Sequence, residues 1–427
     1  MTAHASLDLF RLILGEKPMP DVKAAAPNLL TGVKVLDFTQ FEAGTSCTQV
    51  LAWLGADVVK VENPNGGDPG RRTGSTKPHK DDPYFLNYNS NKRSITVNVK
   101  SPRGLQVIKD LAKKADIFLE NFAPGAIERL GLGYNVLSEI NPGIIYGQVK
   151  GFGEGSPYES NLAFDMIAQA CGGVMSITGE RDGRPAKPGA TLGDSGTGML
   201  MCISILAALH KRKETGKGVH LQVAMQDAML HYIRNSFGLT IKTGKPAPRA
   251  GAKNLEGTNP PCNIYPCAPG GPNDYVYVYT SRGNPEHWPR LLKAIGREDL
   301  IGDPRFETQA ARLENEVELD RIITEFTSKR DKYECMRVIG AAVPSGAVRD
   351  TLEILDDVNF QERAIIQKIE HPHHGTFKMA GWPVRFNGNP PAVKRAPLLG
   401  EHSAEALKDW LGMSDQQVAA LRDDKII

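Results

Sequence analysis

A single aspartate among glycines is the residue of this 427-residue sequence best suited to covalent chemistry. In KPGATLGDSGTGMLM, Asp194 follows Gly193 and precedes Ser195, and an apolar helix is expected from there to about Lys213. One interpretation is structural, because an aspartate at a helix start can accept the free N–H groups of the first turn. The other is a carboxylate nucleophile, whose small neighbours admit an acyl group and whose ionised form is favoured by helix-end donors. Spacing alone does not decide between them.

Two other motifs resemble ligand sites only weakly. The glycines of GFGEGS (151–156) do not match the dinucleotide fingerprint, and the motif follows a late strand, so we predict a loop. His371, His373 and His374 flank a proline and lack an acidic or sulfur ligand at a recognisable spacing. We predict a solvated turn there and no metal site.

The segments that carry these residues alternate between strand and helix patterns. Residues 32–62 have the pattern of a βαβ unit, which implies parallel strands and a right-handed crossover. Further strands are expected over 94–100, 116–120, 144–150 and 219–225, with helices over 101–115 and 226–243. The sequence therefore predicts an α/β fold with an open, Rossmann-like parallel sheet in a large domain.

The pattern changes after residue 243, where a proline-rich stretch begins. A strand over 275–280 and amphipathic helices between 286 and 339 predict a smaller α+β domain. The predicted organisation is an N-terminal extension with a short amphipathic helix (1–29), a large α/β domain (30–243), the small domain with its linkers (244–343) and a C-terminal part that completes the large domain (344–427).

Composition excludes several classes of partner. The 51 Lys and Arg nearly balance the 49 Asp and Glu, so no overall positive field favours nucleic acid. The longest apolar run, 199–209, is about half of the roughly 20 residues that cross a bilayer, so we expect no membrane span. Six cysteines are too few for a disulfide scaffold, and we expect a cytoplasmic protein.

A series of motifs in fixed order carries a family resemblance: LTGVKVLDFTQFEAG, LGADVVKVENP, GDPGR, NSNKRSITVNVKSPRG, ADIFLENFAPGAIERLGLGY, the LAFD…GD pair, GVHLQVAMQDAML and APLLGEH. Together they resemble the class III coenzyme A transferases (CaiB/BaiF type), most closely the formyl-CoA:oxalate branch. The resemblance implies an open α/β large domain with a small domain, in an interlocked homodimer. It also implies transfer of CoA from an acyl-CoA to a small carboxylic acid, with CoA as a substrate and no cofactor.

The resemblance assigns the nucleophile of a conserved Gly-Asp to Asp194, which would form a mixed anhydride and then an aspartyl-CoA thioester. It also assigns substrate-binding positions to Glu42, Ala43, Val97, Asn98, Lys100, Asn121, Phe122, Ala123, Arg129 and Phe164. Arg129 is suited to pairing with a phosphate, and backbone groups near Val97 and Phe122 can hold the nucleotide and pantetheine arm.

Two departures from the oxalate branch concern the substrate. That branch has Gln where Glu42 stands, and GTNPPCNIYPCAPGGPND contains no glycine-rich flap. A carboxylate at Glu42 would repel a dianionic acid unless it were protonated or turned away.

Two alternative functions follow from the same family. Its α-methylacyl-CoA racemases place a His thirty residues before the aspartate as a second base, where this sequence has Phe164, as the transferases have an aromatic residue. A phenyl ring cannot carry a proton, which favours transfer over racemisation or another isomerisation. A non-catalytic CoA-binding paralogue is the other alternative.

Overall fold

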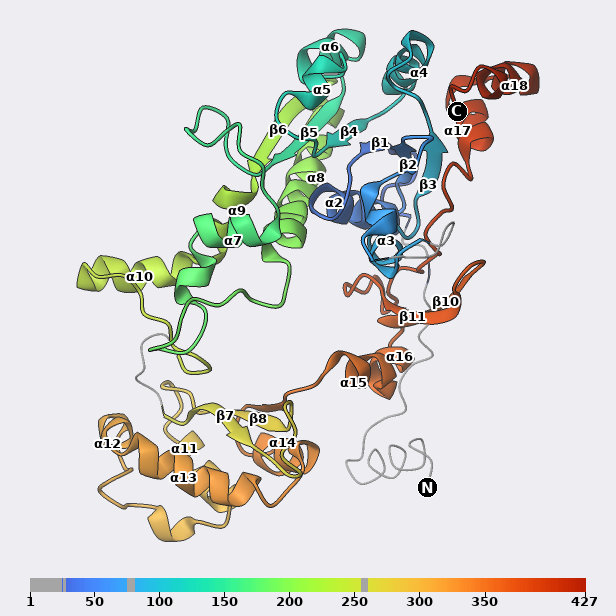
Figure 1. The fold of residues 1–427 in the computed structure, drawn as a ribbon. Helices are drawn as coiled ribbons and strands as arrows, with labels where there is room; N and C mark the ends of the chain where they lie inside the picture. The colour runs from blue at the N-terminus through green and yellow to red at the C-terminus, as the bar shows by residue number, and fades with distance from the viewer. Residues whose placement is uncertain (1–24, 26–27, 75–80, 255–259) are drawn as a thin grey trace. The chain divides into compact units, whose positions relative to one another are not determined.

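A computed structural model describes residue 25 and residues 28–74, 81–254 and 260–427 of the chain (Figure 1). Six strands form one sheet in the order β3-β2-β1-β4-β5-β6, which is the strand order of Rossmann-type folds. The pairs β1 with β2, β2 with β3 and β5 with β6 are parallel, as predicted. The strands are β1 (Lys34–Phe38), β2 (Asp57–Glu62), β3 (Arg93–Thr96), β4 (Ile117–Glu120), β5 (Ile145–Lys150) and β6 (Val219–Ala224).

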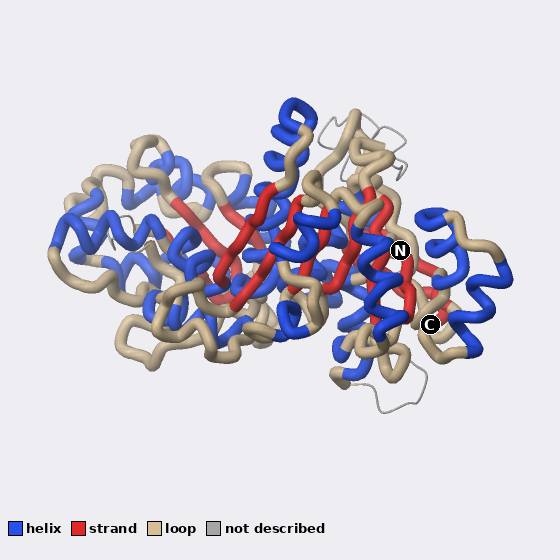
Figure 2. The backbone as a smooth tube through the Cα atoms, turned by 90° about the horizontal axis from the view of Figure 1, so that it is seen from above, coloured by secondary structure: helices blue, strands red, loops and turns tan. Residues whose placement is uncertain are grey.

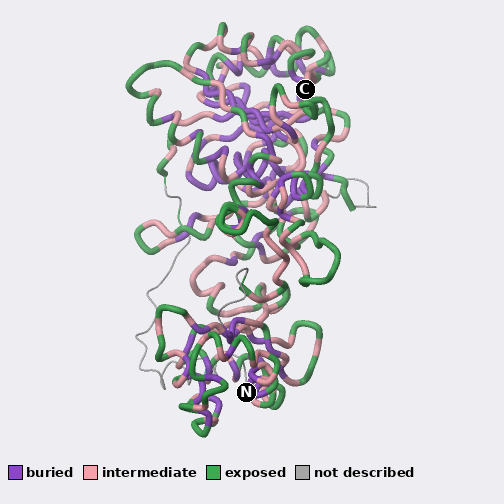
Figure 3. The backbone as a smooth tube through the Cα atoms, turned by 90° about the vertical axis from the view of Figure 1, so that its left-hand side faces the viewer, coloured by how far each residue is buried: buried purple, intermediate pink, exposed green. Residues whose placement is uncertain are grey.

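Helices flank these strands in Figure 2, as expected for an α/β protein. The four central strands β1, β2, β4 and β5 are buried along nearly their whole length. Figure 3 shows the buried parts of the chain in purple. Strands buried on both faces are rich in apolar residues, and this is why the sequence showed them so clearly.

Two predicted elements differ from the structure. The strand predicted over 94–100 ends at Thr96, because its partner β2 ends at Glu62, the residue paired with Thr96. The single helix predicted over 226–243 is two helices, α9 (Met225–Tyr232) and α10 (Arg234–Thr243), because the backbone at Ile233 has a ψ of 10° and leaves helical geometry. The helix predicted near the N-terminus lies outside the described residues.

Contacts group the described residues into two compact units, and each is described by itself. The first comprises the described residues within Met1–Phe41, Thr48–Phe118 and Leu355–Ile427. Its further elements are η1 (Pro69–Arg72), α3 (Pro83–Tyr88), α4 (Pro102–Ala112), α16 (Val358–Glu362), β10 (Ile366–His371), β11 (Gly375–Ala380), α17 (Ser403–Leu411) and α18 (Asp415–Asp423). Helix α2 (Ala43–Trp53) begins in the second unit and ends in the first. The N-cap residue of α4 is Ser101, as predicted.

Buried ion pairs fix the loop after β1 in the first unit. Lys60 of β2 lies 2.8 Å from Asp68, and both side chains are almost fully buried. Asp68 accepts a hydrogen bond from the backbone N–H of Phe41, at 3.1 Å. Phe41 has a φ of +56°, which is unusual for a bulky residue, so this bond helps to hold a strained conformation. Phe41 immediately precedes Glu42, one of the predicted site residues.

The second unit comprises Glu42–Cys47 and Leu119–Ile354. Besides β5, β6, α9 and α10 it contains α5 (Ala126–Arg129), α6 (Tyr134–Ile140), α7 (Asp165–Cys171), η2 (Val174–Ile177), η3 (Leu192–Gly196) and α8 (Thr197–Thr215). Among the described residues, Leu192–Thr215 is the one helical stretch whose length and composition would allow it to span a membrane, with a mean hydropathy of 1.5. A core helix meets the same criteria, and α8 packs on β5 and β6 with Met201 and Ile205 buried.

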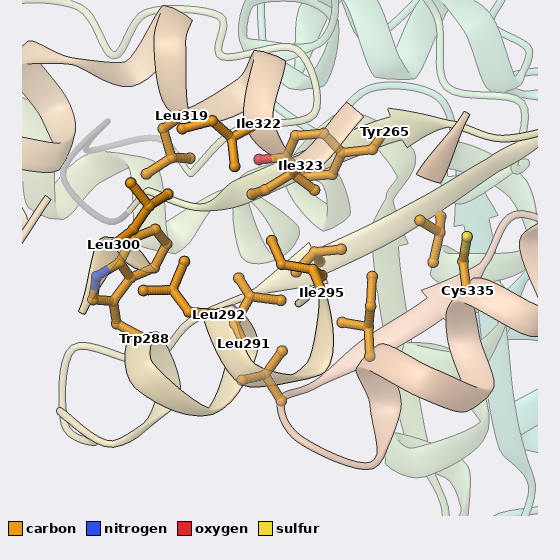
Figure 4. Packing of buried hydrophobic residues seen from close by; sticks show 14 of the residues in the cluster. Tyr265, Trp288, Leu291, Leu292, Ile295, Leu300, Leu319, Ile322, Ile323 and Cys335 are labelled. Atoms are coloured by element: carbon orange, nitrogen blue, oxygen red, sulfur yellow. The ribbon is translucent and has the colours of Figure 1, made fainter. Parts of the chain in front are cut away.

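A small three-stranded sheet and four α-helices occupy the later part of the second unit. The sheet has the order β7-β8-β9 and is antiparallel, and Tyr265, Val276 and Val278 contribute to a core shared with the helices (Figure 4). The elements are β7 (Cys262–Pro266), β8 (Tyr275–Tyr279), β9 (Ser345–Ala347), α11 (His287–Ala294), η4 (Glu298–Leu300), α12 (Gln309–Glu314), α13 (Glu316–Thr327) and α14 (Lys332–Gly340), followed by α15 (Thr351–Asp356). The boundaries at 243 and 343 stay predictions.

Candidate active site

Asp194 lies in η3, a single π-helical turn that leads directly into α8. Turns of this kind are rare and are frequently found at functional sites. The N-cap of η3 is Thr191 and that of α8 is Gly196, and neither helix has a side-chain capping bond. The capping interpretation of Asp194 is therefore wrong. Within the described part of the chain, its carboxylate accepts no hydrogen bond.

The glycines around Asp194 make room for other parts of the protein. A Cβ atom at Gly193 would stand 2.7 Å from the carbonyl oxygen of Asp165, and one at Gly198 would stand 2.5 Å from that of Ala43. At Gly196 it would stand 2.9 Å from the ring of Tyr232. All three distances are too short for a side chain. The small neighbours that we expected to admit an acyl group thus serve close packing around the turn.

Glu42 lies beside this turn and is almost completely buried, with 2% of its surface exposed. Its Oε1 atom accepts a hydrogen bond from the Ser195 hydroxyl at 2.7 Å and another from the Thr191 hydroxyl. The Ser195 hydroxyl also lies 3.2 Å from that of Ser46. Glu42 is therefore held by two residues that stand on either side of Asp194 in the sequence, and the predicted site residues Glu42 and Asp194 are brought together.

Asp165, the first residue of α7, is a third carboxylate at the turn. Its Oδ1 atom accepts the N–H of Gly193 at 2.9 Å, and its Oδ2 atom accepts a bond from Gln169 at 2.7 Å. The Lys187 ammonium lies 3.4 Å from Oδ2. Sequence reasoning missed Asp165 and Lys187 as site residues. The signal was present, since Asp165 ends the LAFD motif and Lys187 begins the KPGATLGD segment.

Burial is the main cause of an unusual pKa at Asp194. Desolvation, followed by the negative charges of Glu42 and Asp165, raises the pKa of Asp194 to about 7, against a smaller lowering by Lys187. We expected helix-end donors to favour the ionised form. That expectation is wrong, because the carboxylate has no donor among the described residues and two like charges nearby.

The predicted CoA-contacting turn Asn121–Ala123 follows β4 and is fixed by a buried ion pair. Glu120 accepts the N–H of Phe122 at 2.7 Å, and the Lys150 ammonium donates to the carbonyl oxygen of Phe122 at 2.8 Å. Lys150 and Glu120 are themselves 2.8 Å apart, and Glu120 is fully buried. The backbone of Phe122 is thus held at both its donor and its acceptor.

The two predicted phosphate-binding cations are exposed. Arg129 ends α5, and no described carboxylate forms an ion pair with it. Lys100 belongs to the first unit and lies in the turn after β3. In this segment the N–H of Val97 donates to the carbonyl oxygen of Glu62 at 2.9 Å, and the N–H of Asn98 donates to that of Ile426 at 2.7 Å. Lys100 is likewise without an ion pair among the described residues.

Phe164 is the N-cap residue of α7 and adjoins Asp165. Its side chain is 55% exposed, which places an apolar ring at the surface next to a residue that touches the Asp194 turn. No proton-transferring group stands at this position.

The GFGEGS motif and the histidine cluster do not form ligand sites of the kinds considered in the sequence. GFGEGS forms a loop, as predicted, in which the N–H of Gly155 donates to Glu159 at 2.8 Å. The histidines lie at the β10–β11 turn, but His371 is buried where we expected a solvated side chain, because it packs against the rings of His373 and His374. Burial lowers the pKa of His371 to about 4. In the described ranges, no group of His, Cys, Asp and Glu residues is arranged to hold a metal ion.

Comparison with known proteins gives one consistent result. The sequence model described as CoA-transferase family III matches residues 30–403. A formyl-CoA:oxalate CoA-transferase of Streptomyces coelicolor is 41% identical over 93% of this chain and 99% of its own length. One from Bradyrhizobium diazoefficiens is 38% identical over 91% of this chain and 95% of its own length.

Solved structures of similar fold agree with this family assignment. A CaiB/BaiF family protein from Brucella suis has a TM-score of 0.79 and 30% identity, covering 90% of this chain and 100% of that protein. The Mycobacterium tuberculosis protein Rv3272 has a TM-score of 0.74 and 29% identity, over 90% of this chain and 99% of its own.

Proposed function

The chain belongs to CoA-transferase family III and is an enzyme, and from this premise we propose that Asp194 carries CoA from an acyl-CoA donor to a free carboxylic acid. The observation that supports this most is the carboxylate of Asp194, which lies in a π-helical turn and is bound by no described donor. A carboxylate that serves structure is normally hydrogen-bonded when it is largely buried. An uncommitted one is available as a nucleophile.

The proposed reaction has four steps. The Asp194 carboxylate attacks the donor thioester, the C–S bond breaks, and a mixed anhydride and CoA thiolate result. The thiolate attacks the aspartyl carbonyl, which gives an aspartyl-CoA thioester and releases the donor acid. The acceptor carboxylate attacks this thioester, the C–S bond breaks, and a second anhydride and CoA thiolate result. The thiolate then attacks the acceptor's acyl carbon, which yields the new acyl-CoA and the free Asp194 carboxylate.

The charges around Asp194 suit these four reaction steps. A raised pKa makes the ionised carboxylate a stronger nucleophile, while a value of about 7 leaves a large fraction ionised at neutral pH. Acylation or thioester formation removes the negative charge of Asp194. Repulsion from Glu42 and Asp165 is then relieved, which favours the covalent intermediates over the free carboxylate.

CoA would be held by the positions assigned from the resemblance. The exposed cations Arg129 and Lys100 are proposed to bind phosphates, and the Asn121–Ala123 turn, which is fixed at Phe122, is proposed to contact the nucleotide. Ala43, Val97, Asn98, Asn121 and Ala123 are proposed to line the same substrate. CoA acts here as a substrate, and no other cofactor enters the proposal.

We also propose a homodimer in the cytoplasm. Large apolar side chains on α7 to α10 of the second unit are exposed in the single chain, which is unfavourable unless another surface covers them. They are Met166, Ile167, Ile203, Leu230, Phe237 and Ile241. All six cysteines are free thiols, as expected in a reducing compartment.

Isomerisation of an acyl-CoA is the alternative that shares this scaffold. It requires a second proton carrier, and the position that holds one in the racemases is Phe164 here. Exchange of the α-proton of a 2-methylacyl-CoA with solvent deuterium, followed by NMR, separates the two reactions. Rapid exchange would favour isomerisation, whereas we expect none.

Mass spectrometry of CoA esters tests the transfer itself. The enzyme would be incubated with acetyl-CoA or succinyl-CoA and a mixture of acids, and new CoA esters would be identified. Asp194→Ala should lose their formation while retaining fold and CoA binding. Asp110→Asn, which changes a partly exposed aspartate of α4, should retain activity. Full activity of Asp194→Ala would remove the nucleophile from the proposal.

A further inference from the structure

We infer that Glu42 is a specificity-determining residue that selects monocarboxylic acceptors and disfavours acids with a second carboxylate next to the reacting one. This inference rests on the proposed transfer at Asp194. It concerns the acceptor, for which the named relatives suggest oxalate.

The Glu42 carboxylate is held toward the Asp194 turn. The Ser195 and Thr191 hydroxyls, on either side of Asp194 in the sequence, both donate to its Oε1 atom. The side chain is almost fully buried, so no bulk water screens its charge. Of the two ways in which Glu42 could tolerate a dianion, turning away is therefore inconsistent with its contacts.

The other charged groups at the turn do not compensate for Glu42. Asp165 contacts Gly193 and adds a second negative charge. Lys187 supplies the one positive charge that acts on Asp194 among the described residues, and it is paired with Asp165. With Asp194 converted to its neutral thioester, the carboxylates of Glu42 and Asp165 and the ammonium of Lys187 are the described charges that act at this position.

This balance matters when the acceptor arrives. An acceptor must bring one carboxylate to the thioester of Asp194, and that cost is common to all acids. An acid such as oxalate brings a second negative charge within a few ångströms of its reacting carboxylate, and therefore also near the carboxylate of Glu42. Repulsion between two like charges at such a separation in a partly buried site is strongly unfavourable. A monocarboxylic acid of equal size avoids this second repulsion.

Matched acids isolate the effect of charge. Oxalate and oxamate differ in that one carboxylate is replaced by a neutral amide of nearly the same shape, and the same holds for malonate with malonamate and succinate with succinamate. Each would be measured as an acceptor, or as a competitive inhibitor of whichever acid the enzyme accepts. We expect the monoamide of the shortest pair to be preferred by about tenfold or more in kcat/KM or in inhibition constant. The preference should shrink as the second carboxylate moves away.

Glu42→Gln tests whether this residue is the cause. Its amide oxygen can still accept both hydroxyl bonds, so the turn should be kept. The variant should reduce the preference for oxamate over oxalate by about tenfold. Glu214→Gln, which removes a negative charge from the exposed face of α8, should leave it unchanged.

The outcomes separate the two levels of the account. If no acid receives CoA from any donor, the proposed transfer is contradicted. If CoA is transferred but wild type uses oxalate as well as oxamate, or if Glu42→Gln keeps the wild-type ratio, the inference about Glu42 is overturned and the transfer stands. Failure of every monoamide to bind would also overturn it, because the inference requires the uncharged partner of each pair to be tolerated.

Discussion

At the scale of residues, the site is an aspartate between two other carboxylates with one lysine nearby. Burial and the charges of Glu42 and Asp165 disfavour ionised Asp194 and raise its pKa to about 7. An ionised carboxylate in such surroundings lowers the stability of the free enzyme. This repulsion is relieved when the residue becomes an uncharged anhydride or thioester. This environment supports the covalent role that we propose for Asp194.

The pH dependence of the first half-reaction should report this environment. Formation of the aspartyl-CoA thioester requires ionised Asp194, so its rate should rise as pH increases through about 7. In Glu42→Gln a neighbouring negative charge is absent, ionisation of Asp194 becomes easier, and the rise should move to lower pH. Rapid-quench measurements across pH would show the shift, with Glu214→Gln as the control. An unchanged midpoint in Glu42→Gln would contradict a contribution of the Glu42 charge to the pKa of Asp194.

Sequence reasoning identified part of this constellation. Asp194 and Glu42 carry motif signals that survive in a single sequence, and the structure places them at one turn. Asp165 and Lys187 were missed because their role depends on which backbone groups they reach in three dimensions. The direction of the Asp194 pKa shift was also wrong, since burial and like charges from distant segments cannot be derived from local spacing.

At the scale of elements, close packing holds the Asp194 turn in place. Helix α8 approaches the start of α2 so closely that only glycine fits at position 198. The predicted strands and helices were mostly confirmed, because buried parallel strands and amphipathic helices have strong periodic signals. The end of β3 and the break between α9 and α10 were not predicted, since both depend on partners and backbone geometry that periodicity does not report.

Two helical glycines give a matched test of this packing. Gly198→Ala would place a methyl group 2.5 Å from the Ala43 carbonyl oxygen, and we expect it to lower the free energy of unfolding by about 1–3 kcal/mol. A Cβ at Gly238 of α10 would meet nothing within 4 Å, so Gly238→Ala should raise that free energy by about 0.5–1 kcal/mol. Urea denaturation of both variants measures the difference. Equal effects would contradict the packing argument.

The ion pair below the Asn121–Ala123 turn should affect CoA binding. Lys150→Met removes the donor to the Phe122 carbonyl and leaves Glu120 without its cation, so the turn should loosen. We expect affinity for CoA to fall on the order of tenfold. Calorimetric titration would measure this, with Lys211→Met, which removes an exposed lysine of α8, as the control. Unchanged affinity in folded Lys150→Met would exclude a role for the pair in positioning the turn.

At the scale of the whole molecule, the second unit exposes large apolar side chains on several of its helices. The exposed side chains lie on consecutive helices α7 to α10, and Ile241 is 84% exposed. The resemblance to family III suggested an interlocked dimer, which no pattern of hydrophobic periodicity in one chain could have indicated. A second copy is the covering surface that we propose.

Light scattering coupled to size-exclusion chromatography tests this association. The wild type should have the mass of two chains, and Ile241→Glu should weaken the dimer because it introduces a charge into an apolar contact. Val317→Glu is a matched control, since Val317 of α13 is 87% exposed and lies outside the α7–α10 surface. A monomeric wild type would contradict the proposal, as would a dimer that Ile241→Glu does not affect.

Trapping of the covalent intermediate tests the central claim most directly. Hydroxylamine added during turnover with an accepted acyl-CoA should convert acylated or CoA-linked Asp194 into a hydroxamate, and peptide mass spectrometry would locate it. The account predicts modification of the peptide containing Asp194, dependent on the acyl-CoA and absent in Asp194→Ala. An unmodified Asp194 peptide in an enzyme that is actively transferring CoA would contradict it.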